Sequence, residues 1–171
     1  TVGLPSDCGI YDVKVNVSAT DNYNAVEDTM TLTITCTDKN GDDYCDDCGV
    51  IYNGIGAHLA GYSVSLNGSI GVNFHMDLTQ DVLKDNDAYM LFTLPNGTTQ
   101  KVMVSDARAK DPAVIEGKTY YIFTCNVAAK EMTSVIKARL VTSTDELVLE
   151  DYTVQKYAEV ILANPDTYAD E

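Results

Sequence analysis

Residues 62–78 read YSVSLNGSIGVNFHMDL and carry the clearest structural signal in the chain. Val64 and Leu66 precede the pair Asn67 and Gly68, and apolar and polar residues alternate after it, with the apolar positions at Ile70, Val72, Phe74, Met76 and Leu78. This alternation is typical of a strand with one buried face. Asn-Gly between two such runs favours a tight turn, because both residues tolerate positive φ. The stretch therefore predicts an antiparallel hairpin.

The same pattern continues toward the C-terminus. Residues 88–106, AYMLFTLPNGTTQKVMVSD, again place two alternating runs on either side of an Asn-Gly pair, Asn96 and Gly97. Three further segments alternate: KTYYIFTCNV, VIKARLVTS and ELVLEDY. Strands spaced this regularly, with turn signals between them, indicate a sandwich. We expect an all-β fold, with an antiparallel β-sandwich of the immunoglobulin or fibronectin kind over residues 57–152. TQDVLKDND and AAKEMTS each predict one helical turn between strands.

Both flanks of this sandwich have their own patterns. IYDVKVNVSA and TMTLTITCT alternate as well, so residues 1–37 are expected to form a separate hairpin. At the other end, apolar residues recur at helical spacing: Val154, Tyr157, Ala158, Ile161 and Leu162. Residues 153–171 therefore predict a short amphipathic helix and tail, with Thr153 as N-cap and a stop at Asn164 and Pro165.

The charge balance narrows the choice of partners. The chain has 171 residues and a formal net charge of −15, from 26 acidic and 11 basic residues. A surface this negative repels phosphate backbones, so we expect neither nucleic acid nor membrane insertion. No apolar run approaches the roughly 20 residues that cross a bilayer. The opening TVGLPSDCG lacks the features of a signal peptide, and we expect flanking domains of a longer chain.

The five cysteines fall into two groups. Cys125 shares a strand face with Tyr121, Phe123 and Val127, which predicts a buried free thiol. Four others cluster in the N-terminal part and are disulfide candidates: Cys8, Cys36, Cys45 and Cys48. Such cysteine use favours an extracellular or cell-surface protein. A bond between Cys8 and Cys36 is sterically reasonable, because the two flank the paired strands, although the sequence leaves all pairings open.

Residues 36–49, CTDKNGDDYCDDCG, resemble the calcium loops of dockerins and thrombospondin type 3 repeats. The oxygens of Asp38, Asn40 and Asp42 fill positions 1, 3 and 5, the Tyr44 carbonyl fills position 7 and Asp46 fills position 9. The loop departs from the pattern at position 6, where Asp43 replaces glycine, and at position 12, where Gly49 offers no carboxylate. Residues 38–56 are therefore expected to form an acidic metal loop and linker that binds Ca²⁺.

Two alternatives compete with calcium in this loop. Cys45 and Cys48 form a C-x-x-C-G knuckle, and Cys36 with His58 would complete four Zn²⁺ ligands. In the second alternative, the loop is a disulfide-tethered acidic linker that binds no ion. Because disulfides and calcium use different atoms, we expect a Ca²⁺ loop together with disulfide bonds.

The sequence gives no sign of catalysis. Nucleophile-elbow, P-loop, dinucleotide-binding and H-E-x-x-H motifs are all missing. His75 alternates with Phe74 and Met76, so we expect it on the exposed polar face of its strand. Six tyrosines are candidates for binding contacts, with ordinary packing as the alternative: Tyr23, Tyr52, Tyr62, Tyr89, Tyr120 and Tyr152.

Two longer segments carry a resemblance. Residues 9–36, GIYDVKVNVSATDNYNAVEDTMTLTITC, resemble the last two strands of bacterial immunoglobulin-like repeats. Residues 62–163, including LNGSIGVNFHMDL, DAYMLFTLPNGTTQKVMVSDA, GKTYYIFTCNVAAKEMTSVIKARL and YTVQKYAEVIL, resemble a module of large surface proteins of gut anaerobic bacteria. The resemblance implies a non-catalytic binding or display module. Its implied partner is a host protein such as immunoglobulin, bound in a superantigen-like way. A carbohydrate-binding accessory module of an extracellular enzyme and a structural spacer are the alternatives.

Overall fold

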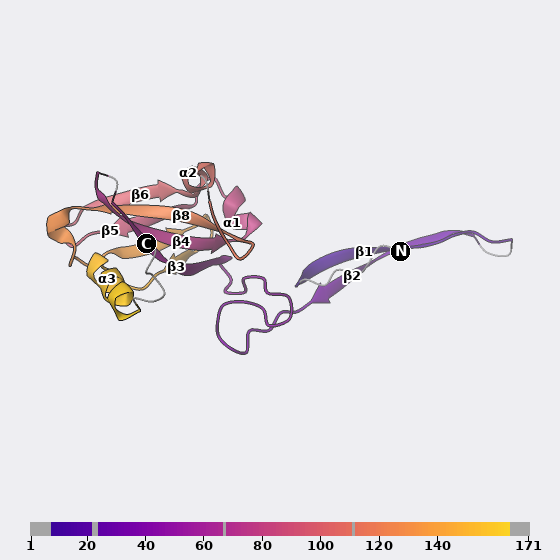
Figure 1. The fold of residues 1–171 in the computed structure, drawn as a ribbon. Helices are drawn as coiled ribbons and strands as arrows, with labels where there is room; N and C mark the ends of the chain where they lie inside the picture. The colour runs from indigo at the N-terminus through magenta and orange to yellow at the C-terminus, as the bar shows by residue number, and fades with distance from the viewer. Residues whose placement is uncertain (1–7, 22–23, 67, 111, 165–171) are drawn as a thin grey trace. The chain divides into compact units, whose positions relative to one another are not determined.

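The computed structural model describes residues 8–21, 24–66, 68–110 and 112–164. The chain divides into two compact units, Thr1–Asn53 and Gly54–Glu171. The first contains a two-stranded hairpin and the acidic cysteine loop, and the second contains two sheets and the helices (Figure 1).

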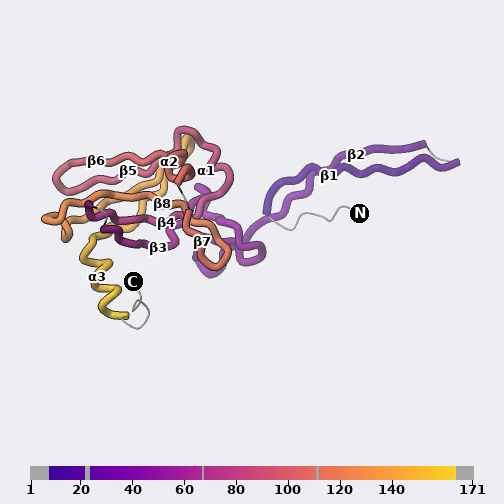
Figure 2. The backbone as a smooth tube through the Cα atoms, turned by 45° about the horizontal axis from the view of Figure 1, so that its top comes forward, coloured from indigo at the N-terminus to yellow at the C-terminus, as the bar shows by residue number. Residues whose placement is uncertain are grey.

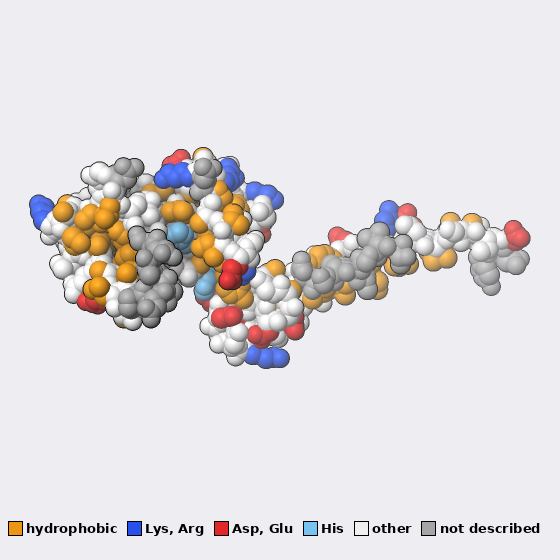
Figure 3. Space-filling view, in the orientation of Figure 1, with side chains coloured by type: hydrophobic (Ala, Val, Ile, Leu, Met, Phe, Trp, Pro, Cys, Tyr) orange, Lys and Arg blue, Asp and Glu red, His pale blue; other side chains and the backbone are white. Residues whose placement is uncertain are grey.

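The hairpin of the first unit pairs β1 (Gly9–Val17) with β2 (Val26–Ile34) in antiparallel register, with Val13 opposite Met30. Residues directly opposite each other share a face, so one face of the ribbon is almost wholly apolar. Its members are Tyr11, Val13, Val15, Val17, Val26, Met30, Leu32 and Ile34. Met30 and Val26 are each 59% exposed, and hydrophobic side chains are visible along the ribbon in Figure 3. The predicted hairpin is confirmed.

The second unit contains two four-stranded antiparallel sheets, seen as layers in Figure 2. The strand order in one sheet is β3 (Ala57–Leu66), β4 (Ile70–Leu78), β8 (Lys118–Val127) and β7 (Ala113–Ile115). The order in the other is β10 (Glu146–Val148), β9 (Lys137–Val141), β5 (Tyr89–Thr93) and β6 (Thr99–Met103). Both hairpins predicted from Asn-Gly pairs form, as β3–β4 and β5–β6. Asn67 lies outside the described residues. The predicted all-β sandwich is confirmed.

The core lies between these two sheets. Phe74 from β4, Phe123 from β8 and Phe92 from β5 are fully buried, and the rings of Phe74 and Phe92 are 5.1 Å apart. Cys125 is fully buried and free, as predicted. Burial in this apolar layer raises the pKa of its thiol to about 12, so Cys125 packs as a small hydrophobe rather than reacting.

Short helices close the ends of the sandwich. The two predicted helical turns form as α1 (Gln80–Lys84) and the 3₁₀ turn η1 (Ala129–Glu131). The predicted C-terminal helix is α3 (Val154–Ala163), and the Thr153 hydroxyl caps it by accepting a 2.9 Å hydrogen bond from the Lys156 N–H. No helix in the described ranges is long and apolar enough to cross a membrane.

Two local features differ from the expectation. The strand predicted through residue 106 ends at Met103, and α2 (Val104–Ala109) follows, because Val104 and Ala107 lie one helical turn apart and are both buried. The turn between β7 and β8 has no Asn-Gly. It consists of Glu116 and Gly117, both with positive φ, as a type I′ turn requires.

Candidate functional site

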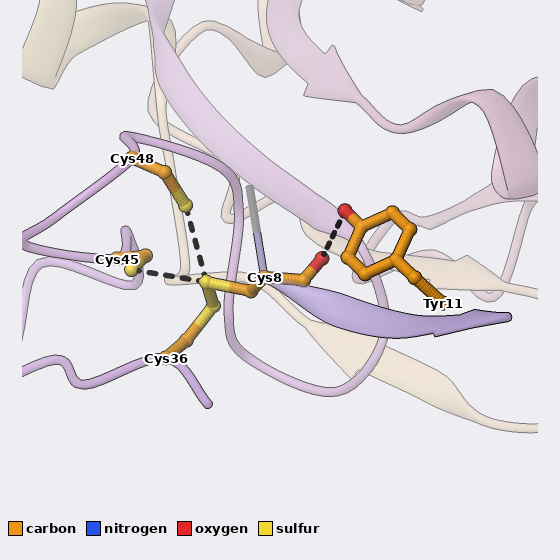
Figure 4. The surroundings of a disulfide bond; sticks show 5 residues. All are labelled: Cys8, Tyr11, Cys36, Cys45 and Cys48. Carbon is orange, nitrogen blue, oxygen red and sulfur yellow. Dashed lines mark hydrogen bonds between the residues drawn. A yellow bond between two sulfur atoms is a disulfide. The ribbon is translucent and has the colours of Figure 1, made fainter. Parts of the chain in front are cut away.

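Four sulfur atoms meet in the first unit. The Sγ atoms of Cys8, Cys36, Cys45 and Cys48 all lie within 4.8 Å of one another. Cys8 is at the centre of this group (Figure 4). It forms a disulfide with Cys36 and lies 3.2 Å from Cys45 Sγ and 3.1 Å from Cys48 Sγ. We call these four residues the sulfur cluster.

The hairpin brings the first two cysteines together. Gly9 and Ile34 are opposite each other at the open end of the ribbon, so Cys8 and Cys36 emerge side by side with Cα atoms 5.4 Å apart. A two-stranded ribbon is marginally stable alone in water. A disulfide that closes a ring of this size stabilises the fold by roughly 3 to 4 kcal/mol in the chain-entropy account.

The loop after β2 folds back to supply the other two cysteines. Asp46 donates its N–H to the Thr37 carbonyl at 2.8 Å, and Cys45 donates to the Val50 carbonyl at 2.8 Å. Tyr44 and Ile51 form an antiparallel bridge. Together these bonds hold the C-x-x-C segment against the chain that follows Cys36.

Cys45 lies in a tight backbone turn that also sets the environment of its thiol. Gly49 donates to the Cys45 carbonyl at 2.8 Å and has a φ of 70°, which a side chain would strain. Burial by itself raises the pKa of the Cys45 thiol, but backbone hydrogen bonds from Cys48 and Asp47 to the sulfur outweigh it, and the net direction is downward. Cys45 is 2% exposed, so its thiol is shielded as well as hydrogen-bonded.

The acidic part of the loop is organised by Asp38. Its carboxylate accepts hydrogen bonds from the N–H groups of Gly41, Asp42 and Asp43, at 2.7, 3.2 and 3.1 Å. Asp43 has a φ of 67°, so it adopts the left-handed conformation that glycine usually supplies at position 6 of calcium loops. The substitution at that position therefore does not prevent the loop from curling.

The other predicted calcium ligands lie in the same curled loop. Asn40 donates to the Asp42 carboxylate at 3.0 Å, and that carboxylate accepts from the Tyr44 N–H at 2.9 Å. Asp46 reaches back from the far side of the loop to accept from the Lys39 N–H at 2.9 Å. Acidic side chains gather over this loop in Figure 3. Separately from these oxygens, the four sulfurs of the sulfur cluster are close enough together to hold a metal ion.

The zinc ligands expected from the sequence need one correction. The sulfur that joins Cys36, Cys45 and Cys48 belongs to Cys8, and His58 instead lies on β3 of the second unit, opposite Asp77 on β4. The sequence separates Cys8 from Cys45 by 37 residues. The hairpin register places Cys8 beside Cys36, and the folded-back loop brings Cys45 to both, so Cys8 could be found by pairing the strands and not by motif spacing.

A second candidate site lies on the sandwich, where β3 is irregular. The pairing of β3 with β4 shifts between Leu59 and Gly61, which indicates a bulge. A hollow of about 330 Å³ lies on one side and includes Tyr62, His75 and Tyr120 in its lining. A second hollow of about 390 Å³ also has Gly61, Tyr62 and Ser63 in its lining, and most of its other lining residues belong to α3.

His75 on this sheet is not exposed as expected, but half-buried. Its Nε2 lies 2.8 Å from the Ser63 hydroxyl, which also accepts from Asn73 at 3.1 Å. Thr124 extends the chain by donating to Asn73 Oδ1 at 2.8 Å. The cross-strand neighbours of His75 are Gly61 on β3 and Ile122 on β8, and the partial burial of its ring lowers the pKa of His75.

Two buried polar atoms beside these hollows have no hydrogen-bond partner among the described residues: the Tyr62 hydroxyl and His75 Nδ1. Burial raises the pKa of Tyr62 to about 12, with smaller contributions from Tyr152 and Glu150. Buried polar groups are nearly always paired in folded proteins, so each of these two atoms calls for a hydrogen-bond partner such as an ordered water.

The six tyrosines proposed as contacts have different roles. Tyr62 and Tyr152 stack on each other, and Tyr152 is 4% exposed, so packing explains it. Tyr89 lies under the Lys101 ammonium, 3.7 Å from the ring centroid. Tyr120 lines a hollow, Tyr52 is 51% exposed, and Tyr23 lies outside the described residues.

Comparisons with family models, with curated proteins and with solved structures find no match for this chain.

Proposed function

We propose that this chain is a non-catalytic module of a secreted or cell-surface protein, and that its sandwich binds a host protein, with immunoglobulin as the first candidate. The observation that carries the proposal is the pair of hollows beside the β3 bulge, whose linings include Tyr62, His75 and Tyr120. Tyrosine supplies apolar contact area and a hydroxyl at little entropic cost, which suits a protein interface.

The rest of the surface favours a basic partner. The net charge of −15 attracts positively charged proteins and speeds their association. The resemblance of residues 62–163 to a surface-protein module supports the same proposal. In this account the sandwich acts by rigid presentation, because the polar chain from Ser63 to Thr124 fixes the floor of the contact area.

We propose in addition that the loop from Asp38 to Asp46 binds Ca²⁺ and stiffens the first unit. The support is the curled loop, in which Asp38 is oriented by three N–H groups and Asp43 takes the left-handed position. Calcium takes six to eight oxygen ligands, and the loop offers Asp38, Asn40, Asp42, the Tyr44 carbonyl and Asp46. Because Gly49 supplies no carboxylate, we expect weaker binding than in a complete loop.

The binding proposal is tested by immobilising the full chain and passing host immunoglobulin and mucin glycans over it in turn. We expect saturable immunoglobulin binding that Tyr120→Ala weakens at least about tenfold, the scale of an interface anchor. Tyr89→Phe is the matched control, because Tyr89 lies on the other sheet. Binding to glycans alone would favour a carbohydrate-binding accessory module. Binding to neither would leave a structural spacer.

A further inference from the structure

We propose that the sulfur cluster, once reduced, is a Zn²⁺ site formed by all four cysteines, Cys8, Cys36, Cys45 and Cys48. This metal site is separate from the oxygen-lined loop and from the contact area on the sandwich. It also differs from a site completed by His58, because the fourth ligand is Cys8, which directly precedes β1 and lies beside Cys36.

The spacing of the sulfurs suits a tetrahedral ion. Zinc binds thiolates at about 2.3 Å, which places the four sulfurs of a tetrahedron roughly 3.8 Å apart. Every pair in the cluster lies within 4.8 Å, and Cys8 Sγ is 3.2 Å from Cys45 Sγ and 3.1 Å from Cys48 Sγ. Cys8 Sγ occupies the centre of the oxidised cluster, so once its bond to Cys36 is opened it must turn away from that centre for the four sulfurs to surround the ion.

The C-x-x-C segment has the backbone that a metal-bound thiolate needs. Gly49 donates its N–H to the Cys45 carbonyl at 2.8 Å and closes a tight turn, and the sulfurs of Cys45 and Cys48 both lie beside Cys8 Sγ. Gly49 turns the chain directly after Cys48 with a φ of 70°. The sulfurs of Cys45 and Cys36 lie in residues that are 2% and 8% exposed, so water has little access to the centre.

The chemistry of the ligands separates this site from the calcium loop. Four soft thiolates select zinc or a similar thiophilic ion, whereas carboxylate and carbonyl oxygens select calcium. The first unit therefore offers a hard and a soft site within one segment of chain. Each can be emptied or removed without changing the donor atoms of the other.

Zinc binding requires that the Cys8–Cys36 disulfide first be opened. A phosphine reductant transfers two electrons to the disulfide and takes oxygen from water, so the products are two thiols and one phosphine oxide. The four thiols then release four protons as Zn²⁺ binds, which leaves a tetrathiolate centre.

The experiment is a Co²⁺ titration of the full chain in phosphine under anaerobic conditions, followed by displacement with Zn²⁺. We expect one Co²⁺ per chain with the thiolate charge-transfer and tetrahedral visible bands, and loss of both bands when Zn²⁺ is added. Cys8→Ser should lose the four-thiolate spectrum, and His58→Gln should keep it. Cys125→Ala in the core of the second unit and Asp12→Asn on β1 are the controls that leave the site intact.

A Cys45→His variant tests whether the loss of the spectrum in Cys8→Ser comes from a missing ligand or from unfolding of the ribbon. Histidine is itself a zinc ligand, so this variant should still take one tetrahedral Co²⁺ with a weaker charge-transfer band. The proposal is overturned if the reduced parent chain gives no thiolate bands. It is equally overturned if Cys8→Ser gives the same spectrum as the parent, because the fourth ligand is then another group.

Discussion

Tyr62 and Tyr152 stack face to face, with ring centroids 3.5 Å apart and planes 10° from parallel. Tyr62 lies on β3, and Tyr152 precedes α3 and bridges to Ile136. The stacked pair therefore attaches the C-terminal segment to the edge strand of the sheet.

Removing one ring of this pair should destabilise the sandwich strongly. We expect Tyr152→Ala to lower the free energy of unfolding by about 3 to 5 kcal/mol, as large-to-small changes of buried aromatic residues do. Urea unfolding followed by circular dichroism measures the change. Tyr152→Phe, which keeps the stacked ring, should lose much less, and an equal loss in both variants would contradict a role for stacking.

Replacing Tyr62 with phenylalanine tests the effect of its hydroxyl on stability separately from its effect on binding. The hydroxyl has no hydrogen-bond partner among the described residues, so Tyr62→Phe removes a buried polar group that contributes no bond. We expect the free energy of unfolding to stay level or rise by up to about 1 kcal/mol. If the hydroxyl serves the proposed partner, the same variant binds immunoglobulin more weakly. A clear loss of stability in thermal melting would show that the hydroxyl has a structural partner.

His75 should make the sandwich less stable in mild acid. Burial lowers its pKa, so the unfolded chain takes up a proton at a higher pH than the folded chain does. The stabilisation is fully present above the ordinary histidine value of about 6.5 and is lost as the pH falls below it. Urea midpoints between pH about 7 and 5 should fall less in His75→Gln than in the parent. Parallel curves for the two proteins would rule His75 out as the cause.

Calcium should raise the melting temperature of the chain through the loop at Asp38. A ligand at 100 times its dissociation constant adds about 2.7 kcal/mol to the free energy of unfolding. We expect Asp38→Asn to abolish the shift, because it removes the carboxylate that the loop is built around. Asp12→Asn on β1 is the control. A parent chain that responds to neither millimolar calcium nor EDTA does not use this loop for calcium.

The cap of α3 is a local test of the C-terminal segment. Thr153 accepts a hydrogen bond from the Lys156 N–H at 2.9 Å. Thr153→Ala should cost about 1 kcal/mol, and Thr153→Ser should retain most of the stability, because serine caps helices equally well. Differential scanning calorimetry distinguishes the two. Identical melting of all three proteins would mean that α3 adds nothing to the cooperative unit.

Local patterns predicted most of the fold. The Asn-Gly turns, the alternation around Phe74 and Phe123, and the burial of Cys125 follow from period-two spacing, which the structure retains. Two features were missed for different reasons. The helix after Met103 has only six residues, too few for a helical period to stand out, and the Glu116 turn uses a residue that seldom adopts positive φ.

The sites were harder to predict because they depend on contacts distant in sequence. Cys8 joins the sulfur cluster through the register of two strands, and His75 becomes half-buried because β3 and β8 both pair with β4. A single strand shows which side chains share a face and not what covers that face. The oxygens of the acidic loop, by contrast, are all contributed by one short segment, so spacing was enough to name them.

The Cys8–Cys36 bond also determines how the chain responds to mechanical force. The two residues flank the whole ribbon, 28 positions apart, so a pull along the chain passes through the sulfur–sulfur bond and bypasses β1 and β2. Reduction would release the ribbon and add roughly 90 to 100 Å of contour length. The oxidised ribbon between Cys8 and Cys36 therefore does not lengthen under force, and it can extend only after the disulfide is reduced.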